Sequence, residues 1–176
     1  MPDPRSGMRE SPYIPEEVRL ESSAVPGLRL LRAAGFALCV ASNQPSAAKG
    51  FTTLAQLDAV EQRARRLLES RGLTLDAWRR CPHHPEGVVP DLAIRCQCRK
   101  PAPGMILDMA RTLDVELGES WMIGDSDTDI EAGRSAGCRT VLVANPGSAH
   151  RRPGLSSPDG VATDLAAAAT FVAAAS

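Results

Sequence analysis

The chain has 176 residues, which is the size of one ordinary domain and is long enough to bury a sizeable core. Twenty lysines and arginines oppose 21 aspartates and glutamates, so the formal net charge is −1. This balance argues against the basic surface of a nucleic-acid or membrane-surface binder. No apolar run approaches the roughly 18 residues of a membrane span, and residues 1–17 hold prolines and charges where a secretory signal is apolar. We expect a soluble, cytoplasmic protein with neither nucleic acid nor membrane as partner.

Apolar periodicity predicts helices and short strands that alternate along the chain. The expected helices are residues 25–34, 53–71, 104–113, 127–136 and 161–176, and the expected strands are 36–41, 77–80, 121–123 and 140–144. Residues 145–160 are expected to form a loop. The alternation predicts one α/β domain over residues 1–176, a mainly parallel sheet with helices on both faces. Ligands of such sheets bind at the carboxyl ends of the strands.

Three of the five cysteines lie close together beside two histidines, which favours a metal site over disulfides. Three thiolates and one imidazole form the closed, tetrahedral ligand set of a structural zinc ion. The predicted ligands are Cys81, His83, Cys96 and Cys98. His84 is the competing imidazole, and a cluster of unligated buried cysteines is the alternative. A zinc ion would order the loop of residues 81–98.

The other two cysteines, Cys39 and Cys138, stand apart from this cluster. Cys39 lies in an apolar run and Cys138 follows a glycine that is expected to end a helix. We expect both to be buried free thiols.

Charged and polar residues follow the zinc cluster and the predicted strands. Arg99 and Lys100 come directly after the last zinc ligand, which favours a phosphate or carboxylate contact over a solvated pair of cations. Asp125 follows a predicted strand and is a candidate Mg²⁺ ligand, whereas Asp127 and Asp129 fit the first turn of the next helix. The turn at residues 42–45 offers a hydroxyl and two amides for phosphoryl oxygens.

Taken in order, the segments SNQPSAAKG, CPHHP, CQCRKPAPGM and GDSDTDIEAGRSAG resemble the haloacid-dehalogenase-like phosphatases. They look most like the branch that contains heptose 1,7-bisphosphate 7-phosphatase and histidinol-phosphate phosphatase. The resemblance covers residues 13–144, and the zinc cluster followed by RKP is its most specific part. It implies a Rossmann-like sheet with a minimal cap and Mg²⁺-dependent hydrolysis of a phosphate monoester, such as a small phosphorylated sugar, through an aspartyl-phosphate.

The resemblance also implies a role for each matching residue. Ser42 would bind the transferring phosphoryl group, Lys100 would neutralise its charge, and Asp125 would bind Mg²⁺. The substrate-lining residues would be Asn43, Gln44, Pro45 and Arg99. These are the roles that phosphoryl transfer requires, because the protein mainly supplies position and charge.

The chain departs from the family at residues 1–12. The family begins with an apolar strand that ends in Asp-x-Asp-Gly-Thr, whose first aspartate is the nucleophile and whose second is the general acid and base. If Gly7 takes the place of the glycine, Pro4 and Ser6 stand where the two aspartates belong, and Asp3 is the only acid just upstream. We therefore expect very low hydrolase activity, and the alternative is a non-catalytic protein that binds a sugar phosphate or a partner.

The missing motif also concerns the fold, because the family's first strand lies in the middle of the sheet. A missing central strand would leave two rows of buried backbone groups unpaired, at a cost of about 1 to 3 kcal/mol for each group. Three possibilities follow: residues 1–8 fill the gap imperfectly, another chain fills it, or the chain lacks its natural beginning. We expect a monomer unless another chain completes the sheet.

Overall fold

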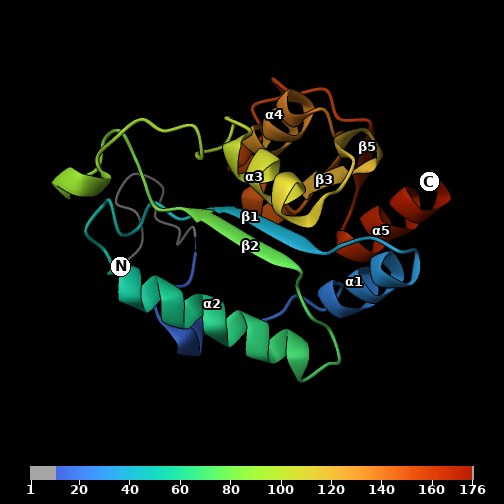
Figure 1. Ribbon diagram of the computed structural model, residues 1–176, viewed down its shortest axis with the longest axis horizontal. Coiled ribbons are helices and arrows are strands. Elements are labelled where there is room, and N and C mark those ends of the chain that lie inside the picture. Colours follow the sequence, from blue (N-terminus) through green and yellow to red (C-terminus); the bar gives the residue numbers. More distant parts are fainter. Residues whose placement is uncertain (1–10, 176) are drawn as a thin grey trace.

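The computed structural model describes residues 11–175 and forms an α/β fold (Figure 1). The helices are α1 (Ala24–Ala33), α2 (Leu54–Glu69), α3 (Gly104–Leu113), α4 (Asp127–Ala136) and α5 (Leu165–Ala174). The strands are β1 (Cys39–Asn43), β2 (Ala77–Cys81), β3 (Trp121–Gly124), β4 (Arg139–Val143) and β5 (Gly160–Ala162). Short 3-10 helices are η1 (Pro15–Glu17), η2 (Pro90–Leu92), η3 (Leu117–Glu119) and η4 (Pro146–Arg151).

All strand pairs in residues 11–175 are parallel, but they form two separate sheets. One sheet has the order β1-β2, with Cys39 opposite Ala77. The other has the order β3-β4-β5, with Trp121 opposite Arg139 and Val141 opposite Gly160. The predicted parallel α/β architecture is therefore confirmed, and no described strand joins β1 to β3.

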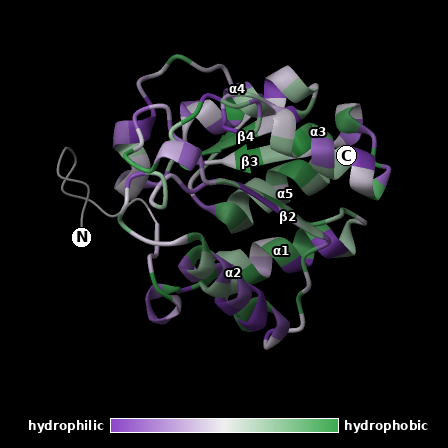
Figure 2. Ribbon diagram, turned by 60° about the vertical axis from the view of Figure 1, so that its left-hand side comes forward, coloured by the Kyte–Doolittle hydropathy of each residue, from purple (hydrophilic) through white to green (hydrophobic). Residues whose placement is uncertain are grey.

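The helices cover both faces of the strands. Figure 1 shows α1, α2 and α5 on one side and α3 and α4 on the other. The apolar residues of the strands lie between these layers, as the colouring of Figure 2 shows. A buried cluster on the α1, α2 and α5 side joins the two sheets: its members include Leu31, Leu68, Val141 and Val172. No described helix combines the length and the apolar composition that crossing a bilayer requires.

Several predicted elements are confirmed closely, because their end signals are local. Helices α3 and α4 have the predicted bounds. The capping box of α2 is complete, since Thr53 Oγ1 accepts from Gln56 N at 3.1 Å and Gln56 Oε1 accepts from Thr53 N at 3.0 Å. Strand β1 begins and ends two to three residues later than predicted, so that Ser42 and Asn43 belong to the strand and not to the turn after it.

The prediction of one helix over residues 161–176 is wrong at its start. Gly160–Ala162 is the strand β5, and α5 begins only at Leu165 behind the cap of Asp164. The tertiary reason is the open edge of β4: the carboxylate of Asp159 accepts from Thr140 N and Thr140 Oγ1 at 2.7 and 2.9 Å and holds the segment there. The predicted loop over residues 145–160 also contains η4.

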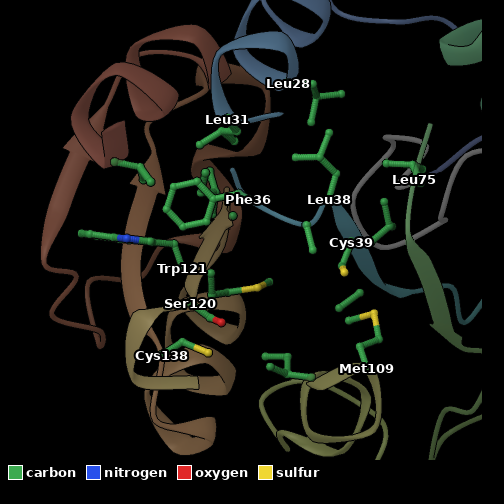
Figure 3. Close-up of a pocket in the computed structure, with 18 of the residues that line it drawn as sticks. Leu28, Leu31, Phe36, Leu38, Cys39, Leu75, Met109, Ser120, Trp121 and Cys138 are labelled. Atoms are coloured by element: carbon green, nitrogen blue, oxygen red, sulfur yellow. The ribbon is translucent and has the colours of Figure 1, made fainter. Parts of the chain in front are cut away.

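The two isolated cysteines differ in burial. Cys138 is buried, as predicted. Cys39 is exposed, which corrects the prediction for this residue. The physical reason is the separation of the sheets, because Cys39 lines the cavity between β1 and β3 (Figure 3).

Candidate active site and metal centre

The four predicted zinc ligands converge. The sulfur atoms of Cys81, Cys96 and Cys98 lie 3.1 to 3.5 Å apart, and His83 Nδ1 lies 3.4 Å from Cys98 Sγ and 3.7 Å from Cys81 Sγ. Zinc–sulfur bonds of about 2.3 Å in a tetrahedron place two sulfurs about 3.8 Å apart, so this cluster has the size of a zinc site. The four residues are one possible metal-binding group.

The three thiols of the cluster alter one another's pKa values. Burial, and then hydrogen bonding to Cys98, raises the pKa of the Cys81 thiol. Burial likewise raises the pKa of Cys98, together with its hydrogen bond to Cys96. Thiols this close cannot all become thiolates unless a positive ion neutralises them, as a bound divalent cation would.

His84, the competing imidazole, lies outside this group. Its Nδ1 accepts a hydrogen bond from Glu86 N at 3.1 Å, and its backbone N–H donates to Leu92 O. The loop between the ligands is further fixed by Val88 and Val89, whose backbone N–H groups both donate to Ala48 O. The ring of His84 therefore stabilises a turn of the loop.

Lys100 occupies the centre of the candidate active site. Its ammonium donates to Ala41 O of β1 and forms an ion pair with Asp129 Oδ1 of α4 at 2.7 Å. Both side chains are only 9% exposed, so the pair is largely shielded from water. The backbone of Lys100 is held by Asn43, whose Oδ1 accepts from Lys100 N and whose Nδ2 donates to Lys100 O, each at 3.0 Å. Lys100 thus connects the carboxyl end of β1 to the first turn of α4, the helix that follows β3.

The acidic segment after β3 divides into three functions. Asp129 completes a capping box with Ser126 and accepts from Asp125 N and Ser126 N at 3.1 Å. Asp127 turns the other way and accepts from Gly154 N, Leu155 N and Ser156 Oγ. Burial opposes ionisation of Asp127, but these three hydrogen bonds lower its pKa below the ordinary value. The Asp125 side chain remains as the carboxylate available to a cation at the end of β3.

Other predicted residues lie around Lys100 at the same edge. Ser42 stands in β1 between Ala41 and Asn43, the two residues that contact Lys100. Gln44 and Pro45 follow and are buried. Among the described residues, the buried Gln44 Oε1 and Ser46 Oγ have no hydrogen-bond partner. Two such polar atoms at the end of a strand fit the edge of a ligand site.

Arg99 lies next to Lys100 but is held differently. Its Nη1 donates to His83 O at 3.1 Å, which ties its guanidinium to the zinc loop. Arg99 is half-buried, and the other nitrogens of its guanidinium can still serve an anion.

Sequence reasoning missed two arginines that reach the site from η4 and the residue after it. Arg152 Nη1 donates to Asp125 O at 3.1 Å and to Ser148 Oγ at 2.8 Å. The guanidinium of Arg151 lies 3.9 Å from Asp125 Oδ1. The only signal in the sequence is a pair of cations in a loop rich in glycine and proline, after the strand β4. These cations add positive charge beside Asp125.

Comparison with known proteins places the chain among phosphatases. The family model described as HAD-hydrolase-like matches residues 97–168. D-glycero-beta-D-manno-heptose-1,7-bisphosphate 7-phosphatase of Yersinia pestis is 34% identical over 142 residues, 81% of this chain and 76% of that protein. The enzyme of the same name from Pseudomonas aeruginosa is 36% identical over 150 residues, 84% of this chain and 80% of that protein.

A solved structure agrees with these relatives. The crystal structure of D,D-heptose 1,7-bisphosphate phosphatase from B. bronchiseptica, complexed with magnesium and phosphate, is 32% identical and has a TM-score of 0.79. The match covers 93% of this chain and 89% of that one. The similarity therefore extends over most of both chains.

Proposed function

The chain belongs to the haloacid-dehalogenase-like hydrolases, and from this premise we propose that its site binds heptose 1,7-bisphosphate and acts on the 7-phosphate. The observation that carries the proposal is the position of Lys100, which joins the end of β1 to the start of α4 through Ala41 and Asp129. A buried ammonium at the carboxyl edge of a parallel sheet is suited to a phosphoryl group.

The proposed roles follow from the contacts of each residue. Lys100 neutralises charge on the phosphoryl group, and Ser42 donates its hydroxyl to a phosphoryl oxygen. Both polar atoms of the Asn43 amide form hydrogen bonds with the Lys100 backbone, so Asn43 positions Lys100. Arg99 and Gln44 face the rest of the substrate, with Pro45 behind Gln44. Asp129 keeps the Lys100 ammonium in place.

Two metals fit the residues present. We propose that Cys81, His83, Cys96 and Cys98 hold Zn²⁺, a structural ion because the four donors leave no open position. We propose that Asp125 contributes a carboxylate to Mg²⁺, a hard cation that prefers oxygen ligands. When bound, Mg²⁺ would stabilise negative charge on the phosphoryl oxygens. Arg151 and Arg152 limit the negative charge around Asp125.

Hydrolysis by these 176 residues is expected to be slow, because Pro4 and Ser6 would stand where the family has its two catalytic aspartates if Gly7 takes the place of the family's glycine. Without a nucleophile, only position and charge remain to accelerate the reaction. The alternatives are a non-catalytic sugar-phosphate binder and a phosphatase for histidinol phosphate.

The experiment measures binding by calorimetry and phosphate release in the presence of Mg²⁺. We expect heptose 1,7-bisphosphate to bind more tightly than histidinol phosphate, with turnover far below about one per second. Ser42→Ala and Arg99→Gln should each weaken binding by about ten-fold, the equivalent of one lost polar contact to a charged group. Arg66→Gln, on the exposed end of α2, is the matched control and should bind as the wild type does. Absence of binding by the wild type would refute the proposed site, and turnover near one per second would refute the slow hydrolysis.

A further inference from the structure

The segment after β4 brings a cation to the carboxylate that is proposed to bind Mg²⁺. Arg151 Nη1, at the end of η4, lies 3.9 Å from Asp125 Oδ1. This distance is too long for a hydrogen bond, so the attraction between the two groups is electrostatic. The side chains of Arg151 and Asp125 are 33% and 36% exposed, and a small cation can therefore reach Asp125 from solution. Arg151 is thus a positive charge of the chain itself beside the proposed metal ligand.

Arg152 fixes the end of η4 that carries Arg151. Its Nη1 donates to Asp125 O at 3.1 Å and to Ser148 Oγ at 2.8 Å, and its Nη2 donates to Asn145 O at 2.8 Å. Ser148, which is only 5% exposed, also donates from its hydroxyl to Asn145 O at 3.1 Å. The guanidinium of Arg152 therefore bonds to carbonyl and hydroxyl oxygens, whereas that of Arg151 lies beside a carboxylate.

Asp127 of α4 fixes the chain directly after the two arginines. Its carboxylate accepts from Gly154 N, Leu155 N and Ser156 Oγ at 3.0, 2.9 and 2.7 Å. These hydrogen bonds and those of Arg152 hold the backbone on either side of residue 153. A change of partner at Asp125 therefore requires a movement of the Arg151 side chain only, and the segment that carries it can stay in place.

The carboxylates at the end of β3 and the start of α4 are matched by cations of the chain. Among residues 11–175, three cations accompany three carboxylates here: Lys100, Arg151 and Arg152 with Asp125, Asp127 and Asp129. An anion that approaches this balanced set of charges meets no excess of negative charge. A divalent cation that approaches Asp125 is instead opposed by the positive charge of Arg151.

We propose that Arg151 is the counter-ion that Asp125 keeps in the absence of a metal, and that Arg151 competes with Mg²⁺ for this carboxylate. Mg²⁺ then binds weakly by itself. Inorganic phosphate binds without Mg²⁺, because Arg151 already neutralises Asp125. The inference rests on the proposed Mg²⁺ site at Asp125, and it adds a control of that site by a residue of the same chain.

The test measures two affinities of the full chain with zinc bound. Electron paramagnetic resonance measures the binding of Mn²⁺, which replaces Mg²⁺ as the probe. Calorimetry in a buffer freed of divalent cations measures the binding of inorganic phosphate. Arg151→Gln removes the charge and Arg151→Lys keeps it, while Asp125→Asn identifies the Mn²⁺ that binds at this carboxylate. Arg66→Gln, at an exposed residue of α2, is the matched control.

We expect Arg151→Gln to bind Mn²⁺ about five-fold more tightly and phosphate about five-fold more weakly, the effect of one partly exposed ion pair. Arg151→Lys should stay within about two-fold of the wild type in both affinities, because the charge remains. Arg66→Gln should change neither affinity, and Asp125→Asn should lose the bound Mn²⁺. The opposite directions of the two changes distinguish a lost charge from a damaged fold, which would weaken both affinities.

Three results would overturn the inference. Weaker binding of both ions by Arg151→Gln would mean that the arginine only supports the fold of the segment. An unchanged affinity for Mn²⁺ would mean that Arg151 does not compete for Asp125. Phosphate binding by the wild type only in the presence of Mn²⁺ would mean that Arg151 does not neutralise Asp125.

Failure of the proposed metal site gives a different result. Mn²⁺ binding that Asp125→Asn leaves unchanged would place the cation elsewhere, and it would refute the proposed site together with the inference. Loss of Mn²⁺ from Asp125→Asn, with equal affinities of the wild type and Arg151→Gln, would support the site and refute only the competition.

Discussion

Single residues fix the geometry of the candidate site through close approaches. Gly124, the last residue of β3, lets Asp129 come near enough to cap α4 and pair with Lys100. A Cβ atom at position 124 would lie 2.2 Å from Asp129 Cβ and 2.5 Å from its carboxylate. No such contact is tolerable, so any side chain here must displace Asp129.

Gly124→Ala should therefore destabilise the protein by about 1 to 3 kcal/mol, the usual cost of overpacking. The matched control is Gly118→Ala, because a Cβ atom at position 118 meets nothing within 4 Å. Urea unfolding of both variants measures the free energy of unfolding. Equal values for the two variants would contradict the proposed role of the close approach.

At the scale of elements, the loop between β2 and α3 carries three of the four proposed zinc ligands, and Cys81 at the end of β2 is the fourth. We expect Cys96→Ser to lose bound zinc and to lower the free energy of unfolding by several kcal/mol, because binding energy at a structural site is folding energy. His84→Ala should keep one zinc per chain, since the His84 ring accepts from Glu86 N and lies outside the group of Cys81, His83, Cys96 and Cys98. Zinc is measured by atomic emission after dialysis. Loss of zinc from the His84 variant alone would reverse the assignment of the imidazole ligand.

The edge strand β5 depends on one carboxylate. Hydrogen bonds from the Thr140 hydroxyl and backbone N–H lower the pKa of Asp159 below its ordinary value of 3.8. A lowered pKa in the folded state contributes stability above the unfolded value, and that contribution is lost as the pH falls through the folded value.

We therefore expect Asp159→Asn to be less stable than the wild type at pH 7, with the difference shrinking below about pH 4. Thermal unfolding from pH 3 to pH 7 measures this. Asp114→Asn is the control, because Asp114 is exposed and follows the end of α3. A difference between wild type and Asp159→Asn that does not change with pH would contradict the role of ionisation.

At the scale of the whole molecule, the separation of the two sheets predicts uneven protection of backbone amides. The N–H groups of Val40 and Ser42 pair with β2, whereas those of Cys39 and Ala41 face the cavity between β1 and β3. In the protein alone, the second pair should exchange with deuterium roughly ten-fold faster or more, because no ladder bond holds them. Nuclear magnetic resonance resolves the four amides. Equal protection along β1 would contradict the separation of the two sheets.

The sequence alone predicted those features whose signals lie in a few neighbouring residues. The predicted zinc ligands lie in two short segments, and their residue types alone limit the metal and its geometry. The bounds of α3 and α4 and the cap of α2 were predicted for the same reason, since a helix end depends on a few neighbouring residues. The departure at Pro4 and Ser6 was equally visible without a structure, although these residues lie outside the described part of the chain.

The tertiary structure decided what depends on residues far apart in the chain. Asp127 and Asp129 are chemically alike and two positions apart, yet one holds Gly154 and the other holds Lys100. The exposure of Cys39, the strand β5 and the approach of Arg152 to Asp125 were likewise beyond local patterns. All three features depend on which strands lie side by side. Hydrogen bonds between strands join segments that are far apart in the chain, and sequence periodicity describes each segment separately. For this reason the residue types alone predicted the chemistry of the candidate site. The arrangement of the two sheets determined where in the molecule those residues come together.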